Sequence, residues 1–334
     1  ARRRMPRMFY DYADSGSWTE STYRANEADL AAVRLRQRVA VNLESRSTAT
    51  TIVGEPFAMP LAIAPVGLTG MMHADGEMLA ARAAHAAGVQ YTLSTLSICS
   101  IEDVASAVER PFWFQLYVMR DRGFVESLVQ RAEAAGCSAL VVTLDLQVLG
   151  QRHKDIKNGL STPPKPTLTN VLNLATKPAW CWDMLNTSRR SFGNVVGHVS
   201  GVADVASLSE WVGKQFDLTL SWDDVAWLRS IWPRKLILKG IMDPADASLC
   251  VQSGADALIV SNHGGRQLDG AQSSIRALPG IADAVGDYLE VLMDGGVRSG
   301  QDVLKAVASG ARGVLAGRAP IYGLGAGGQA GVAR

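Results

Sequence analysis

The sequence lacks several features that would place it in a well-known class of protein. Its four cysteines, Cys99, Cys137, Cys181 and Cys250, stand far apart without a CxxC pair. This spacing argues against a zinc site or a disulfide framework and fits a reducing compartment. No apolar run approaches the roughly 18 residues needed to cross a bilayer, and no HExxH motif or carboxylate cluster suggests a metal ion. The chain is therefore not expected to span a membrane, although it could lie on one.

A strong charge of either sign is also missing. The chain has 33 Lys and Arg against 32 Asp and Glu, so no electrostatic bias toward nucleic acid is expected. With 334 residues and 47% hydrophobic content, it can bury a large core. We predict a soluble enzyme with one domain, residues 1–334. The chain begins Ala1-Arg2 without an initiator Met and ends at residues 331–334, where an eighth helix would start, so neither end is expected to be the natural one.

From residue 61 onward, an apolar segment, a polar loop and an amphipathic helix recur in that order. Several helices end in a small residue followed by glycine, which adopts the left-handed conformation without steric cost and returns the chain to a strand. These glycines are Gly88, Gly136, Gly254 and Gly310. The predicted strands span residues 61–66, 90–94, 112–117, 139–144, 235–239, 257–261, 290–294 and 313–317, and the clearest helices span 76–87, 123–135, 244–252 and 301–308.

Eight nearly continuous apolar strands alternating with helices indicate a parallel sheet covered on its outer face, and eight strands favour closure into a TIM (β/α)8 barrel. An open doubly wound sheet is the alternative. A nicotinamide-binding Rossmann fold is less well supported, because no GxGxxG motif opens a helix after an early strand. In a barrel the chemistry belongs at the carboxyl ends of the strands. Polar residues gather there: Gln115, Tyr117, Thr143, Asp145, Lys239, Ser261, His263, Asp294 and Arg298.

Two regions fall outside this repeat. Residues 1–60 form a helical lead-in, with a helix predicted at about residues 22–33. An insertion of about residues 145–234 follows the fourth strand, and connections this long usually carry function or extra structure. It contains Pro163-Pro164-Lys165-Pro166 and six of the eight tryptophans: Trp180, Trp182, Trp211, Trp222, Trp227 and Trp232.

The segment SNHGGRQLDG, residues 261–270, follows a buried strand. It places a base, His263, and a fixed cation, Arg266, just beyond the strand end. Histidine accepts a proton near neutral pH, and arginine holds a carboxylate through two parallel hydrogen bonds. An enzyme that deprotonates a carbon bearing a carboxylate needs both groups. A polar turn with a structural histidine is the alternative, which the order of all ten residues disfavours.

A phosphate-binding end is predicted beyond the seventh and eighth strands, where DGGVRSG at residues 294–300 and Gly317-Arg318 follow. Glycines let backbone N–H groups approach an anion, a following helix N-terminus adds a favourable dipole, and arginine adds charge. Phosphate sites recur at these two strand ends in barrels. Ordinary strand-to-helix turns are the alternative for each segment taken alone.

Together these segments resemble the FMN-dependent 2-hydroxy acid oxidase and dehydrogenase family, which includes glycolate oxidase, mandelate dehydrogenase and the flavin-linked L-lactate dehydrogenases. The resemblance runs from about residue 10 to residue 332. It implies FMN as the cofactor, with Lys239 near the reducible edge, where it stabilises the anionic reduced flavin. The cofactor-binding residues that it implies are Pro65, Val66, Gly67, Ser94, Gln115, Thr143, Lys239, Ser261, Asp294, Gly295, Gly296, Arg298, Gly317 and Arg318.

The same resemblance implies the residues that act on the substrate. His263 would take the proton, while Asp145 orients its ring and stabilises the imidazolium. Two arginines would hold the carboxylate and two tyrosines would hydrogen-bond the substrate's oxygens. Tyr10 competes with Tyr12 for one of these roles, and either could simply pack the lead-in helix. The implied catalytic residues are His263, Asp145 and Tyr117, and the implied substrate-binding residues are Tyr12, Tyr117, Arg152, His263 and Arg266.

We therefore predict FMN-dependent oxidation of an (S)-2-hydroxy acid to the 2-oxo acid. L-Lactate is favoured, because residues 180–243 look most like the bacterial L-lactate dehydrogenases; (S)-mandelate dehydrogenation and an oxygen-using oxidase are alternatives. The residues suit both a carbanion route and direct hydride transfer. A barrel isomerase or aldolase with a phosphorylated substrate is an alternative of another class, which a flavin spectrum would separate. A non-catalytic scaffold is disfavoured by the intact base and carboxylate clamp.

The resemblance also bears on partners. Oxidases of the family often carry Ala where this chain has Gly67, so a dehydrogenase that passes electrons to a quinone or another acceptor is favoured. Tryptophans in the insertion suit a membrane interface, with ordinary packing as the alternative. We expect a cytoplasmic protein with peripheral contact on the inner face of the cell membrane. We also expect a homo-oligomer, a tetramer by the resemblance.

Overall fold

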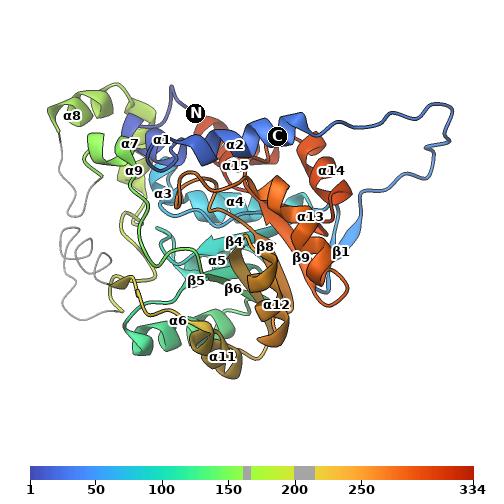
Figure 1. The fold of residues 1–334 in the computed structure, drawn as a ribbon. Helices are drawn as coiled ribbons and strands as arrows, with labels where there is room; N and C mark the ends of the chain where they lie inside the picture. The colour runs from blue at the N-terminus through green and yellow to red at the C-terminus, as the bar shows by residue number, and fades with distance from the viewer. Residues whose placement is uncertain (161–166, 199–214) are drawn as a thin grey trace.

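Eight apolar segments form parallel strands that close into a barrel in the computed structural model, which describes residues 1–160, 167–198 and 215–334 (Figure 1). Each strand pairs with the next along the chain, and the last pairs with the first. The closed barrel confirms the predicted fold class and excludes the open doubly wound sheet. The strands are β3 (Leu61–Ile63), β4 (Gln90–Ser94), β5 (Trp113–Tyr117), β6 (Ala139–Thr143), β7 (Lys235–Ile241), β8 (Ala257–Val260), β9 (Glu290–Asp294) and β10 (Gly313–Ala316).

Helices alternate with the strands and cover the outside of the barrel, as the repeat predicts (Figure 1). Gly88, Gly136, Gly254 and Gly310 all have φ angles between 69° and 111°, which residues with side chains rarely adopt. The four predicted helix-to-strand returns are therefore confirmed. The helices are α3 (Thr69–Met72), α4 (Gly76–Ala86), α5 (Ile101–Ala107), α6 (Arg122–Ala134), α12 (Pro244–Gln252), α13 (Ser274–Val285), α14 (Gly300–Ala308) and α15 (Arg318–Ala333).

The eighth helix differs from the expectation. The sequence predicts a start near residue 331, whereas α15 begins at Arg318, directly after β10. Glycine is a poor helix former, so the glycine-rich sequence conceals a helix that tertiary packing stabilises. Gly325 allows that packing, because a Cβ there would collide with the Met5 side chain. Non-helical backbone at Gly327 and Gly328 kinks the helix near its end.

The amino-terminal end of the barrel is closed by a hairpin that the sequence analysis did not identify. Strands β1 (Thr50–Ile52) and β2 (Glu55–Phe57) pair antiparallel, and their apolar side chains join the inward side chains of the barrel. Trp113 is fully buried there and donates its indole N–H to the Glu55 carboxylate at 3.2 Å. Because this end is sealed, ligands reach the barrel from the carboxyl ends of the strands.

Two lead-in helices, α1 (Arg7–Ala13) and α2 (Ser21–Ala32), extend beside the carboxyl ends of the strands (Figure 1). Helix α2 agrees with the predicted helix at residues 22–33. Its first turn is capped by Asp269, which accepts hydrogen bonds from the Thr22 N–H at 2.9 Å and the Ser21 hydroxyl at 2.7 Å. Burial opposes ionisation, but these hydrogen bonds hold the pKa of Asp269 well below its usual value. The acidic residue of the SNHGGRQLDG segment therefore anchors α2 to the barrel.

The long connection between β6 and β7 contains two kinds of helix in its described residues, 144–160, 167–198 and 215–234. The first three are additions to the barrel pattern, whereas the last buries one face in the barrel core, as a crossover helix does. The run at residues 163–166 and Trp211 lie outside the described residues. In the described part of this connection the helices are α7 (His153–Lys157), α8 (Leu168–Ala175), α9 (Pro178–Asn186) and α11 (Trp222–Ile231).

Most of the described tryptophans in this connection pack inside the protein. Trp232 is fully buried, and Trp222 and Trp227 pack against the barrel core. Trp180 donates its indole N–H to a backbone carbonyl at 2.9 Å. In the described part of the connection, Trp182 alone is largely exposed, at 68%. The packing alternative therefore accounts for most of these tryptophans. None of the helices in the described ranges is long and apolar enough to span a bilayer.

Candidate active site

The loop after β8 holds His263 at the carboxyl end of the barrel. His263, Gly264 and Gly265 have φ angles of 58°, 65° and 74°, a left-handed run that is costly for a residue with a side chain. The glycines are also needed for close packing. A Cβ on Gly264 would lie 2.9 Å from the Arg318 guanidinium, and one on Gly265 would collide with the backbone of Tyr23. The glycine pair therefore lets the loop pack against α2 and α15 while it positions His263.

Asp145, just beyond β6, orients the imidazole of His263. The His263 Nδ1 lies 2.8 Å from Asp145 Oδ1, so the ring donates through Nδ1 and leaves Nε2 able to accept a proton. Nε2 lies 3.4 Å from the Tyr117 hydroxyl. Burial lowers the pKa of His263, Asp145 opposes this shift, and Lys239 and Arg266 add to it. The imidazole is therefore neutral at neutral pH and suited to act as a base.

The two neighbours of this histidine keep the protonation states that the chemistry needs. Burial would raise the pKa of Asp145, but His263 and Lys239 hold it below its ordinary value, so the carboxylate stays charged. Its Oδ2 atom has no hydrogen-bond partner among the described residues. Burial raises the pKa of Tyr117, with the Asp145 charge adding to the shift. Tyr117 therefore keeps its proton and can donate it in a hydrogen bond.

Lys239 places a permanent cation deep in the barrel. The strand register shifts between Lys239 and Ile241 of β7, at Gly240, whose φ angle is 110°. A Cβ added at Gly240 would lie 2.8 Å from the Asp145 Cβ. The Lys239 Nζ lies 2.9 Å from Asp294 Oδ2 and donates to the Ser261 hydroxyl at 2.8 Å. Burial would lower the pKa of Lys239, but Asp294 and Asp145 raise it above its ordinary value. The ammonium group is therefore charged throughout the neutral range.

Two arginines meet over the ring of Tyr12. Their guanidinium carbons lie 4.6 Å (Arg266) and 5.9 Å (Arg152) from the ring centroid. The Arg266 Nη1 donates to the Tyr12 carbonyl at 2.5 Å and to the Ser15 carbonyl at 3.1 Å, while its buried Nη2 has no partner among the described residues. Burial and the Arg152 charge lower the pKa of Arg266 to about 10, so it remains a cation at neutral pH. A fixed buried cation with a free N–H group suits a carboxylate ligand.

The sequence left open whether Tyr10 or Tyr12 contacts the substrate, and the two side chains lie in different places. Tyr12 lines the pocket, and a Cβ on Gly67 would come within 3.2 Å of its hydroxyl. The Tyr10 ring instead stacks on Tyr322, with the ring centroids 5.9 Å apart. The geometry therefore favours Tyr12 for contact with the substrate.

A row of polar side chains joins the ends of three neighbouring strands. The Ser94 hydroxyl donates to Gln115 Oε1 at 3.2 Å, and Gln115 Nε2 donates to Thr143 Oγ1 at 2.9 Å. All three side chains are buried. These hydrogen bonds fix the orientation of the Gln115 amide. Residues 65–67, which follow β3, line the same pocket.

The predicted phosphate end lies where α14 and α15 begin, so two helix N-termini face it. Gly295 and Gly296 have φ angles of 98° and 82°. Arg298 lies 2.6 Å from the Glu27 carboxylate, and Arg318 donates to the Gly264 carbonyl at 3.0 Å. Both guanidinium groups are held at the pocket wall by these contacts.

One pocket brings the predicted site residues together. It is lined by all of them except Asp145 and Ser261, which stand directly behind His263 and Lys239. The residues present fit FMN: a buried polar row suits the ring system, a buried cation suits its reducible edge, and a glycine turn with two arginines suits the phosphate. The assignment of each residue to a role stays a prediction.

Sequence reasoning missed the contacts that join elements far apart in the chain. It assigned Asp294 to the phosphate end, whereas the carboxylate pairs with Lys239. It also gave no role to Phe216, whose ring packs edge-on against Tyr117 at 6.4 Å and lines the pocket together with Leu146 and Leu149. These three apolar residues form a wall of the pocket next to Tyr117.

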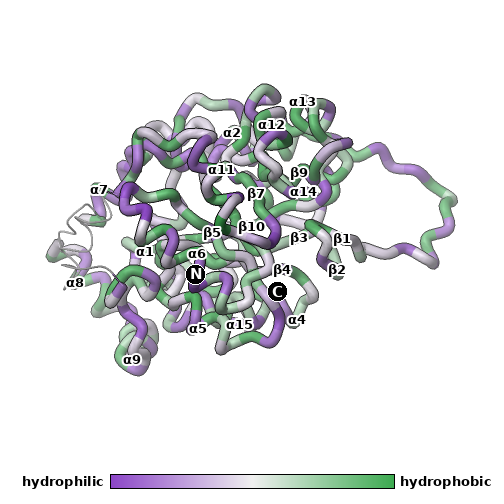
Figure 2. The backbone as a smooth tube through the Cα atoms, turned by 90° about the horizontal axis from the view of Figure 1, so that it is seen from below, coloured by the Kyte–Doolittle hydropathy of each residue, from purple (hydrophilic) through white to green (hydrophobic). Residues whose placement is uncertain are grey.

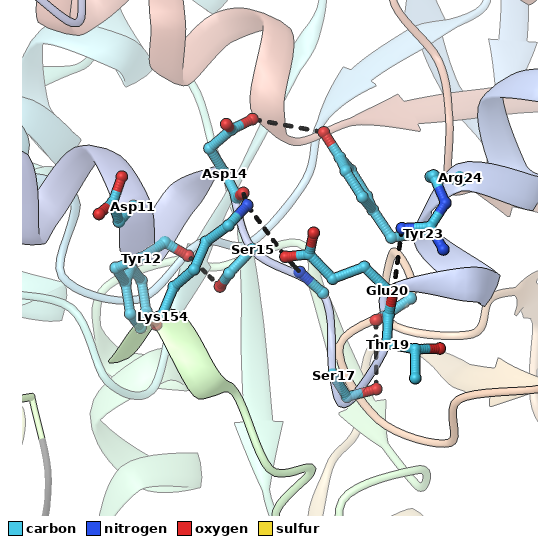
Figure 3. A network of polar contacts seen from close by, with 12 residues as sticks. Asp11, Tyr12, Asp14, Ser15, Ser17, Thr19, Glu20, Tyr23, Arg24 and Lys154 are labelled. Carbon is cyan, nitrogen blue, oxygen red and sulfur yellow. Dashed lines mark hydrogen bonds and ion pairs between the residues drawn. The ribbon is translucent and has the colours of Figure 1, made fainter. Parts of the chain in front are cut away.

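Lys154 of α7 makes further contacts that no sequence pattern revealed. Its Nζ donates to the Asp14 carbonyl at 2.8 Å and lies 3.0 Å from Glu20 Oε1, which also accepts from the Gly16 N–H at 3.1 Å (Figure 3). Helix α7 follows Arg152, and the lead-in carries Tyr12. Lys154 therefore fixes these two candidate substrate-binding groups relative to each other.

The chain belongs to the FMN-dependent dehydrogenase family, whose model matches residues 1–334. It is an FMN-dependent 2-hydroxy acid dehydrogenase, and the predicted cofactor and class of enzyme are confirmed.

Its relatives agree over almost the whole chain. It is 49% identical to an L-lactate dehydrogenase of Ectopseudomonas mendocina (strain ymp), across 99% of this chain and 88% of that protein. It is 50% identical to an L-lactate dehydrogenase of Caulobacter vibrioides (strain NA1000 / CB15N), across 99% and 87%. Among solved structures, it resembles the monotopic membrane protein (S)-mandelate dehydrogenase, with a TM-score of 0.93 and 37% identity, covering 99% of this chain and 88% of that one.

Proposed function

We propose that this chain oxidises L-lactate to pyruvate. The observation that carries the proposal is the joint placement of a base and a carboxylate site in one pocket. The free Nε2 of His263 lies 3.4 Å from the Tyr117 hydroxyl, and Arg266 presents a buried N–H group without a partner among the described residues. A 2-hydroxy acid needs both groups, because its carboxylate must be held while a proton leaves the neighbouring carbon or its hydroxyl.

The residues divide the work as follows. Arg266 and Arg152 hold the carboxylate of lactate, and Tyr117 donates a hydrogen bond to a substrate oxygen. His263 accepts a proton at Nε2, and Asp145 stabilises the imidazolium that forms. When bound, FMN would accept the two electrons and the second proton that leave the substrate. The loss of two electrons and two protons converts the hydroxy acid into the 2-oxo acid.

L-Lactate is preferred over (S)-mandelate as the substrate on the comparisons. Identity to the L-lactate dehydrogenases is 49–50%, against 37% to the (S)-mandelate dehydrogenase of similar structure. The second candidate is favoured by one observation, the apolar wall of Leu146, Leu149 and Phe216, which would also accept a phenyl group.

An anaerobic substrate panel tests the proposal. L-Lactate, D-lactate, glycolate and (S)-mandelate are mixed separately with the FMN-loaded enzyme, and bleaching of the oxidised flavin is followed. We expect L-lactate to reduce the flavin at least tenfold faster than (S)-mandelate, and D-lactate to leave it oxidised. Faster reduction by (S)-mandelate would transfer the assignment to the second candidate. No bleaching by any hydroxy acid, with FMN still bound, would contradict both.

We further propose that α8 and α9 rest on a membrane and that the electrons pass to a quinone. Exposed apolar side chains repeat at helical spacing on α8 and continue on α9, and the two helices pack together. A paired apolar surface of this kind suits the boundary between lipid headgroups and acyl chains. The residues, called the α8–α9 surface below, are Leu168, Val171, Leu172, Trp182 and Leu185, with exposed fractions between 55% and 76%.

Basic residues lie beside this surface. Arg7 donates its backbone N–H to Asn173 of α8 at 2.7 Å, and Lys177 donates to the Arg3 carbonyl at 2.7 Å. The exposed Arg2, Arg3, Arg4 and Arg7 therefore border the two helices. Positive charge around an apolar surface favours anionic lipids. The monotopic (S)-mandelate dehydrogenase of similar structure supports the proposal.

Vesicle co-sedimentation tests the membrane contact. The unmodified enzyme should sediment with vesicles that contain anionic lipid and less with neutral ones, and the pair Leu172→Glu/Leu185→Glu should remain in the supernatant. A matched control, Leu218→Glu, changes an exposed leucine outside α8 and α9 and should still sediment. Equal sedimentation of the pair and the unmodified enzyme would contradict the assignment. Faster electron transfer to oxygen than to a soluble quinone would contradict the acceptor.

We propose finally that the protein forms a homo-oligomer, a tetramer by the family resemblance. The support for this proposal is the chain's membership of the FMN-dependent dehydrogenase family.

A further inference from the structure

Glu77, in the first turn of α4, is a fully buried carboxylate that the chemistry described above does not use. Helix α4 packs beside α5 and β4 (Figure 2). Two segments pass close to Glu77: residues 64–70, called the β3 segment below, and residues 94–99, called the β4 segment. A carboxylate is costly to bury unless hydrogen bonds or an opposite charge compensate it. The contacts of Glu77 therefore show what keeps it in the interior.

Glu77 accepts backbone hydrogen bonds from both segments. Its Oε1 atom accepts from the Gly70 N–H at 3.0 Å and the Ile98 N–H at 2.9 Å, and Oε2 accepts from the Cys99 N–H at 3.4 Å. These donors lie beyond the paired residues of β3 and β4. Burial raises the pKa of Glu77, and the hydrogen bonds oppose this rise. One carboxylate thus joins two segments where the strand ladder has ended.

The two segments approach each other closely beside this carboxylate. A Cβ on Gly70 would lie 2.6 Å from the Ile98 Cβ and 2.8 Å from Glu77 Oε2. The Leu68 N–H donates to the Leu96 carbonyl at 3.0 Å. The hydrogen bonds of Glu77 therefore act on two segments that are already in contact, so a small change at the carboxylate displaces both.

The same two segments form walls of the candidate active site. Residues 65–67 of the β3 segment and Ser94 and Leu96 of the β4 segment line the pocket. They also face each other there, because a Cβ on Gly67 would lie 3.3 Å from the Leu96 carbonyl oxygen. The distance between the segments is therefore the distance between two pocket walls.

A second buried side chain holds the β4 segment from another side. Asn194, fully buried, donates to the Ser94 carbonyl at 3.4 Å and the Thr95 carbonyl at 3.3 Å. Its side-chain oxygen accepts from the Ile101 N–H at 2.9 Å. Asn194 therefore fixes the β4 segment in place, whereas Glu77 sets its distance from the β3 segment.

We propose that Glu77 is a positioning residue for FMN, whose carboxylate fixes the distance between the two walls that would enclose the flavin ring. The proposal rests on the cofactor-binding roles proposed for residues 65–67 and Ser94. Glutamine cannot replace this carboxylate, because an amide NH2 group donates hydrogen bonds and cannot accept them. In Glu77→Gln at least one backbone N–H would face another donor, and the walls would shift. The proposed carboxylate site at Arg266 and Arg152 lies on other segments and should keep its geometry.

FMN release and flavin reduction in Glu77→Gln test the proposal. Release is followed as free-flavin fluorescence after dilution of the loaded enzyme, and reduction is followed by stopped flow with the hydroxy acid that reduces the parent fastest. Because small misplacements of reacting groups are costly, we expect roughly tenfold faster release and a limiting reduction rate lower by roughly fivefold or more. The substrate concentration for half-saturation should stay within about threefold of the parent, since the carboxylate site is intact.

Two control variants separate positioning from a general loss of stability. Glu126→Gln changes an exposed glutamate on α6, and Val129→Ala opens a cavity in the buried face of the same helix. Both should keep the parent values of release and reduction, although Val129→Ala unfolds more easily. Parent values in Glu77→Gln would overturn the proposal, as would equal losses in Val129→Ala. A rise in the half-saturating concentration alone in Glu77→Gln would overturn it as well.

Amide hydrogen exchange on the unmodified, FMN-loaded enzyme gives a test that needs no variant. The N–H groups of Gly70, Ile98 and Cys99 should exchange roughly a hundredfold more slowly than exposed loop amides, because exchange requires the contact with Glu77 to open. Exchange at the rate of exposed loops would overturn the proposal even if Glu77→Gln fails to fold. FMN release and amide exchange do not involve a substrate, so a failure of the L-lactate assignment would appear only in the substrate panel.

Discussion

The strand ends and the segments that cover them hold their functional residues in different ways. At the strand ends, Lys239 and Asp294 pair at 2.9 Å with side chains only 5% and 10% exposed. In the cover, formed by α1, α2 and α7, Lys154 and Glu20 pair at 3.0 Å with side chains 39% and 22% exposed. Buried pairs are rigid and costly to break, whereas partly exposed pairs are weak and easily remodelled. We infer that the barrel fixes the chemistry and that the cover adjusts recognition.

This difference predicts how variants should divide. Changes at the strand ends should lower the rate of flavin reduction or the stability of the fold, because those groups act on the reacting atoms or sit in the core. Changes in the cover, and at Arg266, which donates to the Tyr12 carbonyl of the cover, should mainly raise the substrate concentration needed for half-saturation. The predictions below test this division, beginning with the largest expected effect.

Replacement of His263 with Ala should have the largest effect on rate. The change removes the proposed base and leaves the proposed carboxylate site intact, so flavin reduction should slow by roughly 10²–10⁴-fold. Binding of a non-reacting analogue, such as the 2-oxo acid product, should change little. Anaerobic stopped-flow measurement of flavin absorbance provides the test. Reduction within tenfold of the parent rate would remove His263 from the role of base.

Replacement of Lys239 with Met should have the largest effect on stability. Asp294 would be left as an uncompensated buried charge, which typically costs about 3–5 kcal/mol. Denaturant unfolding monitored by tryptophan fluorescence measures this loss. The double variant Lys239→Met/Asp294→Leu should regain most of the stability while flavin reduction stays impaired. If the single and double variants were equally unstable, the pair would not be the source of the effect.

Replacement of Arg266 with Lys should weaken substrate binding more than it slows the chemistry. A lysine supplies one point charge and cannot reproduce the fork that contacts Tyr12, Ser15 and the substrate together. We expect KM for L-lactate to rise by roughly tenfold or more, since a charge-assisted hydrogen bond contributes about 1.5–3 kcal/mol. Steady-state kinetics with an artificial acceptor dye measures the change. An unchanged KM would place the substrate's carboxylate elsewhere.

Replacement of Lys154 with Met should have the smallest effect, confined to recognition. Without the contacts to Asp14 and Glu20, Tyr12 and Arg152 lose their fixed relation, and KM should rise by about three- to tenfold at nearly constant kcat. Lys154→Arg should restore much of the loss. The control Lys157→Met, an exposed lysine on the same helix, should match the parent. A drop in kcat without a change in KM would contradict the division between barrel and cover.

The barrel and most residues of its pocket were predictable from the sequence, and the reasons are local. Each strand is a short apolar run, each return from a helix is marked by glycine, and parallel strands in a barrel bring their carboxyl ends together. Residues near the carboxyl end of a strand or just beyond it, such as Lys239 and His263, therefore had to converge. The SNHGGRQLDG segment, residues 261–270, added the identity of the chemistry through its resemblance to the family.

Contacts between distant segments were not predictable in this way. Nothing local indicates that Asp294 pairs with Lys239, that Asp269 caps α2, or that Phe216 returns to the pocket from the long connection. The α15 helix was not evident from the sequence because glycine is a poor helix former. Its glycines are found in a helix here because close packing requires them. The tryptophans were taken as candidate membrane contacts, yet the exposed surface consists mainly of leucine and valine. Exposure depends on tertiary packing, which residue type alone does not determine.

The pH dependence of flavin reduction tests the central claim, that neutral His263 held by Asp145 is the base. Because burial lowers the pKa of His263, the second-order rate constant for reduction by L-lactate should be constant at neutral pH and fall below an apparent pKa under 6.5, as the imidazole takes up a proton. In Asp145→Asn, the charge that raises this pKa is gone, so the plateau should drop and the fall should begin at a lower pH. A parent profile that still rises above pH 8, or an unchanged profile in Asp145→Asn, would contradict the account.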